Sequence, residues 1–116
     1  MSPQQVRLVN SPILKIGSHA LSHSSLPALT TERKRAEIFE SVERCAALSG
    51  EQPRTFAYPY GDYDDEAALL VEECGFVCAC TTEGRAVKDR TPHFGLPRIG
   101  VGNWEPELME RVLLEL

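Results

Sequence analysis

The chain has 116 residues, of which 42% are apolar and 25% charged, and 17 acidic against 12 basic side chains give a net charge of −5. These values predict one globular domain over residues 1–116. They argue against a nucleic-acid partner, because no large basic patch is present, and against a membrane span, because no apolar run is long enough to cross a bilayer. The polar N-terminus is not a secretory signal, so the expected location is cytoplasmic by default.

The first part of the chain predicts a helix, a strand and a second helix. Ser2 and Gln5 form a capping-box pattern that begins a short helix, which ends near Asn10. Residues 13–16 are apolar and predict a short strand. A long helix is expected over residues 30–48, because its apolar residues recur at helical spacing.

The rest of the chain alternates in the same way. Three more strands are predicted, at residues 55–58, 76–82 and 96–101. Pro97 weakens the start of the last strand. A helix capped by Asp62 or Asp64 is expected to end before Gly75, and a final helix begins at Pro106.

This alternation indicates right-handed βαβ units, and hence an α/β fold with about four mostly parallel strands and flanking helices. In such sheets, functional residues collect at the carboxyl ends of the strands. Polar, aromatic or glycine residues follow each predicted strand here: His19 and His23, Pro59-Tyr60-Gly61, Thr81-Thr82, and Gly102-Asn103-Trp104. We therefore expect these four segments to meet at one rim of the sheet.

His19 and His23 are the first candidate site. Two imidazoles four residues apart, where a strand passes into a turn, can converge on one ion, and neutral imidazole suits zinc and its first-row neighbours. The spacing alone favours this interpretation no more than that of two polar loop residues. Cys80 is a weaker candidate for a third ligand. Cys78 and Cys80 alternate with Phe76 along a predicted strand, so we expect all three to be buried on one face.

Two short motifs connect the chain to a known family. The run Gly17-Ser18-His19-Ala20-Leu21-Ser22-His23 resembles the metal-binding histidine motif of the polysaccharide deacetylases, the NodB-homology family. The run Phe56-Ala57-Tyr58-Pro59-Tyr60-Gly61 is similar to the next motif of that family, at a similar distance downstream. Leu96-Pro97-Arg98-Ile99 and Trp104 are similar to the run that closes the domain in one branch of it.

The resemblance implies a distorted (β/α) barrel, which in a chain of this length is partial and open. It also implies a divalent metal, zinc in the first place, with cobalt or another transition metal as alternatives. The implied reaction is hydrolysis of N-acetyl or O-acetyl groups on a carbohydrate polymer. The metal would polarise the acetyl carbonyl and lower the pKa of a bound water.

The resemblance also implies roles for single residues. They are His19 and His23 as metal ligands, the Tyr60 backbone N–H as oxyanion donor, Tyr58 and Trp104 as the lining of a sugar groove, and Arg98 as a catalytic residue. Arg98 would compensate for the arginine of the family's second motif, which is Ala57 here.

Each of these roles has a structural alternative. The segment with Tyr60 is also a good turn before a helix cap. Trp104 would more often lie in a core, and Arg98 could form an ion pair with a nearby acid. His93, beside a proline in a polar loop, is expected at the surface.

One part of the family pattern is missing. The family has a paired-aspartate motif before the histidines, which supplies a third metal ligand and the general base, but this chain has no Asp before Asp62. The family's late general-acid histidine also has no counterpart, because the context of His93 does not match. We therefore interpret the chain as the C-terminal portion of a deacetylase domain.

An incomplete barrel leaves the strand at residues 13–16 as an open edge, which predicts self-association. The missing aspartates keep a second hypothesis open, a non-catalytic remnant that binds carbohydrate or a partner chain. A small flavodoxin-like regulatory domain is a third, less favoured, because such a domain would need acidic residues where this chain has histidines.

Overall fold

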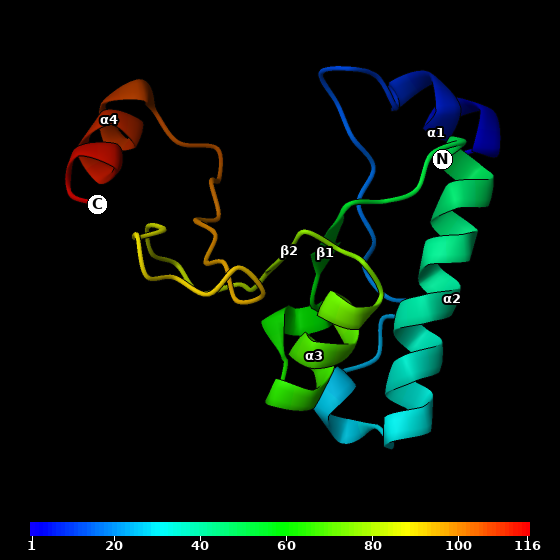
Figure 1. The fold of residues 1–116 in the computed structure, drawn as a ribbon. Coiled ribbons are helices and arrows are strands. Elements are labelled where there is room, and N and C mark those ends of the chain that lie inside the picture. The colour runs from blue at the N-terminus through cyan, green and yellow to red at the C-terminus, as the bar shows by residue number, and fades with distance from the viewer.

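The computed structural model describes residues 1–116. Its helices are α1 (Pro3–Val9), α2 (Thr31–Ser49), α3 (Asp65–Glu73) and α4 (Pro106–Leu114), with two short 3-10 turns, η1 (Leu26–Ala28) and η2 (Pro59–Gly61). Its strands are β1 (Thr55–Ala57) and β2 (Cys78–Cys80). Figure 1 shows α2 and α3 packed beside the strands, with α1 across one end of α2.

The helix ends follow from capping groups in the sequence. The predicted capping box forms at Ser2 and Gln5. Thr30 caps α2 through its side chain, and Gly50 ends that helix in the left-handed conformation at φ 79°. Of the two candidates for the cap of α3, the structure uses Asp64, whose carboxylate accepts the Ala67 N–H.

The strands confirm an α/β fold of the partial, open barrel type. β1 and β2 are parallel, with Phe56 opposite Ala79. Single parallel bridges extend the sheet on both sides, from Ser18 to Phe56 and from Cys80 to Leu96. Four chain segments therefore lie side by side in sequence order and point the same way, as the βαβ pattern predicts.

The first outer strand was predicted in the wrong place, and the last was predicted too long. Residues 13–16 form no strand, because Ile13 is 95% exposed and only Ser18 reaches β1. At the other side, Leu96 alone pairs with β2, and the next N–H on that side, from Arg98, donates to the Glu83 carbonyl beyond the end of the strand.

The core lies between the sheet and helices α2 and α3. Its nine buried apolar residues are Leu26, Ile38, Phe56, Tyr58, Ala67, Leu70, Val71, Phe76 and Ala79. The prediction that Phe76, Cys78 and Cys80 share one buried face was wrong, since both cysteines are only half-buried while Ala79 between them is fully buried. Phe76 precedes the strand, so strand alternation does not govern its side chain.

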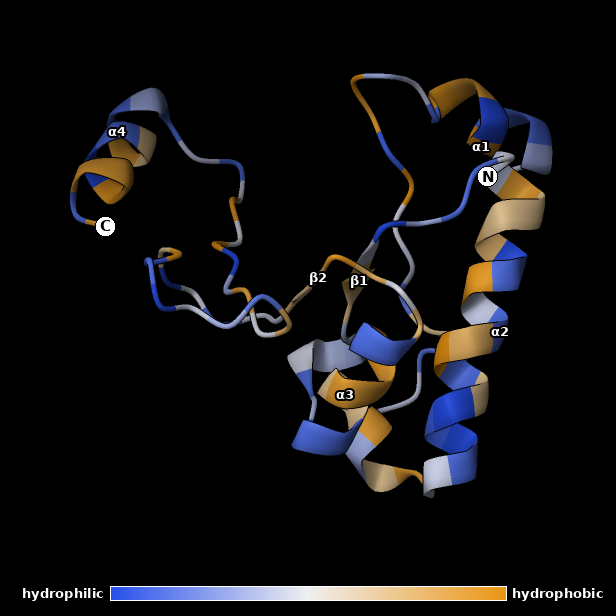
Figure 2. Cartoon of the chain, viewed as in Figure 1, coloured by the Kyte–Doolittle hydropathy of each residue, from blue (hydrophilic) through white to orange (hydrophobic).

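Helix α4 stands apart from this core. It has apolar residues on one side, as Figure 2 shows, but none of its residues is buried. Figure 1 places it away from α1, α2 and α3. No helix of the structure has the length and apolar character that a bilayer span requires.

Candidate active site

The first bridge of the sheet positions His19. The Ser18 N–H donates to the Thr55 carbonyl and the Ala57 N–H donates to the Ser18 carbonyl, both at 2.9 Å. His19 therefore emerges just past the paired backbone. Its Nδ1 lies 2.7 Å from the Ala57 carbonyl oxygen. Since a carbonyl can only accept, Nδ1 carries the proton and the Nε2 lone pair is free for a ligand.

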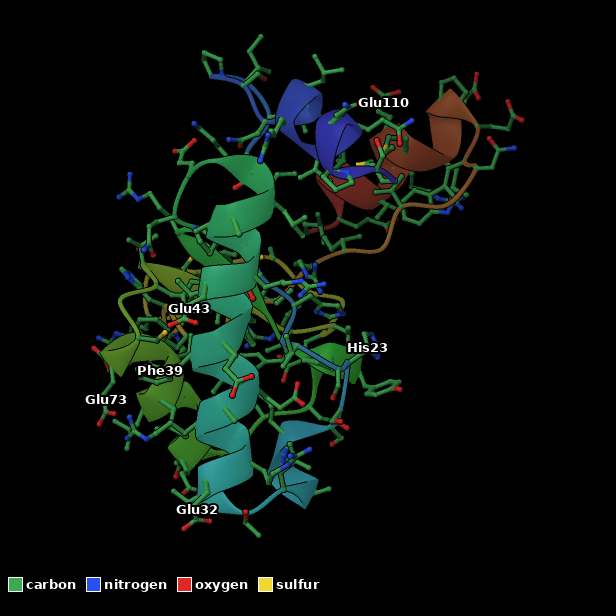
Figure 3. The ribbon with its side chains drawn as sticks, turned by 90° about the vertical axis from the view of Figure 1, so that its right-hand side faces the viewer. His23, Glu32, Phe39, Glu43, Glu73 and Glu110 are labelled. Carbon is green, nitrogen blue, oxygen red and sulfur yellow. The ribbon has the colours of Figure 1, made fainter.

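Three rings from two loops then meet at this rim. The His19 and His23 rings have their centroids 4.6 Å apart at 73°. The His23 and Tyr60 rings have theirs 4.7 Å apart at 80°. All three residues are exposed, and Figure 3 shows His23 at the edge of the molecule, on the other side of α2 from Glu73. The expectation that the two motifs converge at the carboxyl ends of the strands is confirmed for these residues.

The same two loops hold all the strained non-glycine backbone of the chain. Ala20, His23 and Tyr60 have φ values of 63°, 61° and 60°, and no other non-glycine residue has a positive φ. This conformation costs roughly 1–2 kcal/mol for a residue with a β-carbon. Such residues concentrate at functional sites, where the surrounding structure holds them in place.

The turn at Tyr60 leaves one donor unused. The Gly61 N–H donates to the Tyr58 carbonyl at 2.9 Å, and the Asp62 N–H donates to the Pro59 carbonyl at 3.0 Å. The Tyr60 carbonyl accepts the Thr82 hydroxyl at 3.2 Å. The Tyr60 N–H has no acceptor in the protein, so it is available to a ligand at the rim.

A buried carboxylate binds the loop between His19 and His23, which we call the histidine loop. Glu37 of α2 is 4% exposed, and its Oε2 accepts the Leu21 N–H at 3.0 Å and the Ser22 N–H at 2.8 Å. Its Oε1 accepts the Ser22 hydroxyl at 2.6 Å. Burial raises the pKa of Glu37, but the hydrogen bonds from Ser22 and Leu21 outweigh it, and the net pKa is lowered.

Sequence reasoning did not identify Glu37. The signal was present in α2, where the residues at i, i+3, i+4 and i+7 of the buried face are Lys34, Glu37, Ile38 and Ser41. Three polar residues on a buried helix face need partners inside the protein. Their presence indicates that something polar, here the histidine loop, packs against that face.

Tyr58 does not line an exposed groove, which corrects that expectation. Its side chain is completely buried, and its Oη donates to the Phe94 carbonyl at 2.8 Å. Its ring stacks on Tyr63, with centroids 4.7 Å apart. Burial raises the pKa of Tyr58, so the hydroxyl stays protonated as a donor in the core.

Arg98 does not form the ion pair considered from sequence. Its Nε donates to the Thr81 carbonyl at 2.8 Å, and it makes no ion pair with an acidic side chain. It therefore holds the end of β2, next to Thr82 and its bond to Tyr60. Trp104 is half-buried with its ring against Gly102, in the segment that leads away to α4, so the structure does not bring it to the histidines.

The donor set fits part of a transition-metal site. His19 and His23 offer two imidazoles in ring contact, but no group of three His, Cys, Asp or Glu residues gathers anywhere in the chain. Cys80 is thus not a third ligand of this pair. His93 is exposed, as expected, and contributes only its carbonyl, which accepts the Ala79 N–H.

Comparison with known proteins gives the same family as the motifs. Residues 1–79 match the polysaccharide deacetylase family. The chain is 34% identical over 61 residues to chitin deacetylase 1 of Cryptococcus neoformans and 35% identical over 60 residues to chitin deacetylase 1 of Saccharomyces cerevisiae. These matches cover 53% and 52% of this chain, but only 13% and 20% of the two relatives.

Solved structures show the same fold. The deacetylase PplD of Streptococcus pyogenes, in complex with acetate, superposes with a TM-score of 0.87 at 18% identity. The superposition covers 96% of this chain and 50% of PplD, so the chain corresponds to about half of that protein. The family match, the relatives and the fold agree: this chain belongs to the polysaccharide deacetylase family.

Proposed function

We propose that the chain carries the histidine side of the active site of a metal-dependent carbohydrate deacetylase, which removes N- or O-acetyl groups from a polymer. The observation that carries this is the cluster of His19, His23 and the strained Tyr60 turn at one rim. Family membership and the chitin deacetylase relatives support the reaction class.

The residues of this chain would divide the work as follows. His19 and His23 would hold a divalent cation, most readily zinc, through nitrogen atoms that the fold leaves free of protein partners. The cation supplies Lewis-acid polarisation of the acetyl carbonyl. The Tyr60 N–H would donate to the oxyanion that develops on that carbonyl, a contribution typically worth about 10²–10³ in rate.

Metal binding tests the proposal directly. Titration calorimetry with Zn²⁺ or Co²⁺ on the full chain should show one site, which His19→Ala and His23→Ala each abolish or weaken by more than tenfold. His93→Ala is the matched control, because its ring lies outside the cluster, and it should bind like the unsubstituted chain. No binding, or binding that the two cluster variants leave unchanged, would contradict the proposal.

A second function has an observation in its favour. Catalytic zinc usually has three protein ligands, and this chain gathers only two. A non-catalytic domain that binds carbohydrate or a partner chain is therefore the alternative. Release of acetate from an acetylated chitin oligomer by this chain alone would exclude it.

A further inference from the structure

The loop between the two histidines is attached to the protein through very few bonds. From His19 to Ser24, only the main-chain N–H groups of Leu21 and Ser22 find an acceptor in the protein, and for both it is the Glu37 carboxylate. The Ser22 hydroxyl donates to the same carboxylate. One side chain of α2 thus fixes the middle of the loop.

The two anchored residues lie between two strained ones. Ala20 at φ 63° precedes them and His23 at φ 61° follows them. A residue with a β-carbon has a higher energy in the left-handed conformation, so its backbone returns to a negative φ unless other contacts hold it. Without the bonds to Glu37, no other main-chain hydrogen bond in this stretch would keep His23 turned toward His19.

We propose that Glu37 is a positioning residue, which sets the separation and orientation of the two imidazoles and thereby tunes their affinity for a metal. This inference rests on the proposed function, since it assigns the metal to His19 and His23. Glu37 forms no hydrogen bond with either ring, so its effect passes through the backbone of Leu21 and Ser22. Partners that orient metal ligands typically change affinity by about 10- to 100-fold when removed.

Three variants and one control separate positioning from simple stability. Glu37→Ala removes all three bonds, and Glu37→Asp withdraws the carboxylate by one methylene if the alanine variant does not fold. Glu37→Gln keeps the shape, because its amide oxygen can accept both N–H groups and its NH₂ can donate to the Ser22 hydroxyl. The control is Lys34→Met, which removes a 4% exposed group one turn earlier in α2 whose partners are Asp64 and Glu66.

Two measurements on the metal-free and Co²⁺-titrated chain test the inference. We expect Glu37→Ala, or Glu37→Asp in its place, to weaken Co²⁺ binding about tenfold or more and to accelerate amide hydrogen exchange at Leu21 and Ser22. Glu37→Gln should restore most of the affinity. Lys34→Met should lower the urea midpoint yet leave Co²⁺ affinity and these two amides as they are in the unsubstituted chain.

The outcomes distinguish the two proposals. If the unsubstituted chain binds no Co²⁺, the proposed function fails, and the metal-positioning role of Glu37 fails with it. If the unsubstituted chain binds Co²⁺ and Glu37→Ala or Glu37→Asp binds it equally well, only the role of Glu37 is overturned. Equal losses of affinity in Glu37→Ala and Lys34→Met would also overturn it, because the effect would then be general instability.

Discussion

Gly61 packs against Thr82 so closely that a β-carbon on Gly61 would overlap the Thr82 hydroxyl and come within 2.7 Å of the Thr82 amide nitrogen. Gly61 ends η2, which follows β1, and Thr82 lies two residues past the end of β2. The Thr82 hydroxyl also donates to the Tyr60 carbonyl. Close packing and a hydrogen bond thus join the Tyr60 turn to the end of the neighbouring strand.

This packing predicts a large effect of Gly61→Ala. Gly61 has φ 75°, so alanine would incur both the cost of a left-handed backbone and a clash with the Thr82 backbone. We expect a loss of about 2–5 kcal/mol in the free energy of unfolding, from about 1–2 for the backbone and about 1–3 for overpacking. Urea unfolding followed by circular dichroism measures it.

Gly50→Ala is the matched control for the clash. Gly50 has a similar φ of 79°, but a β-carbon there would meet nothing within 4 Å. It should therefore show only the backbone cost, about 1–2 kcal/mol. Equal losses in the two variants would contradict a close approach of Gly61 to Thr82.

Much of the site could be predicted from the sequence because parallel strands all end at the same edge of a sheet. The alternation of helix and strand predicts that residues after the strands lie at one rim, and His19, His23 and Tyr60 do, whereas Trp104 does not. The histidine spacing and the Pro59-Tyr60-Gly61 turn are local features. Local features of this kind are visible without knowing what packs against them.

The features that were missed depend on packing between distant segments. Tyr58 is buried because Phe94 and Tyr63 enclose it, and neither neighbour is evident from the run around Tyr58. Glu37 is 15 residues from Ser22, and its role appears only when α2 lies under the histidine loop. The strand expected at residues 13–16 has the right composition but lacks the partners that make a strand.

The buried Tyr58 hydroxyl predicts a stability loss at alkaline pH. Its pKa is raised above the ordinary value of about 10 by burial, and by the nearby Tyr63 and Asp64. Above pH 10 the unfolded chain releases this proton while the native protein keeps it, so the native state binds more protons and stability falls as pH rises. Urea midpoints between pH 8 and 11 should show this fall.

Tyr58→Phe isolates that contribution. The variant leaves the Phe94 carbonyl without its donor, which should cost about 1–3 kcal/mol at pH 7. Its stability should then fall less steeply above pH 10 than that of the unsubstituted chain. Tyr60→Phe, which removes a hydroxyl from a ring that is 63% exposed, serves as the control. An unchanged alkaline slope in Tyr58→Phe would count against the prediction.

The outer edge of the sheet predicts self-association. Ile13 and Leu14, just before the bridge at Ser18, are 95% and 62% exposed. Exposed apolar residues beside an unpaired edge favour pairing with another chain. Size-exclusion chromatography across a concentration series should show a species larger than the monomer, and Ile13→Lys should reduce it.

Leu113→Lys is the control for that experiment, because Leu113 is 59% exposed but lies on α4. A substitution there removes a similar apolar side chain without touching the edge. An equal effect of both variants would indicate general hydrophobic association. A monomer at all concentrations would contradict the edge argument.

Asp64 predicts how the protein loses stability in acid. Its Oδ1 accepts the Ala67 N–H at 2.8 Å and its Oδ2 lies 2.6 Å from the Lys34 ammonium. Burial raises the pKa of Asp64, but the bonds from Lys34 and Ala67 outweigh it and lower the pKa below its ordinary value of about 3.9. Below that value the unfolded chain takes up a proton before the native protein does, so stability is lost as pH falls from about 4 through the native pKa.

Asp64→Asn should keep the helix cap and lose the charge. The asparagine oxygen can still accept the Ala67 N–H, but Lys34 then has only Glu66 as an anionic partner. We expect a loss of about 1 kcal/mol at pH 7, a figure reduced for the 37% exposure of the Asp64 side chain, and a shallower fall in stability between pH 4 and 2. Asp65→Asn, in the first turn of α3 and exposed, is the control and should change neither quantity. Acid unfolding followed by circular dichroism measures the dependence of stability on pH. If the Asp64→Asn curve runs parallel to that of the unsubstituted chain, Asp64 does not couple stability to pH.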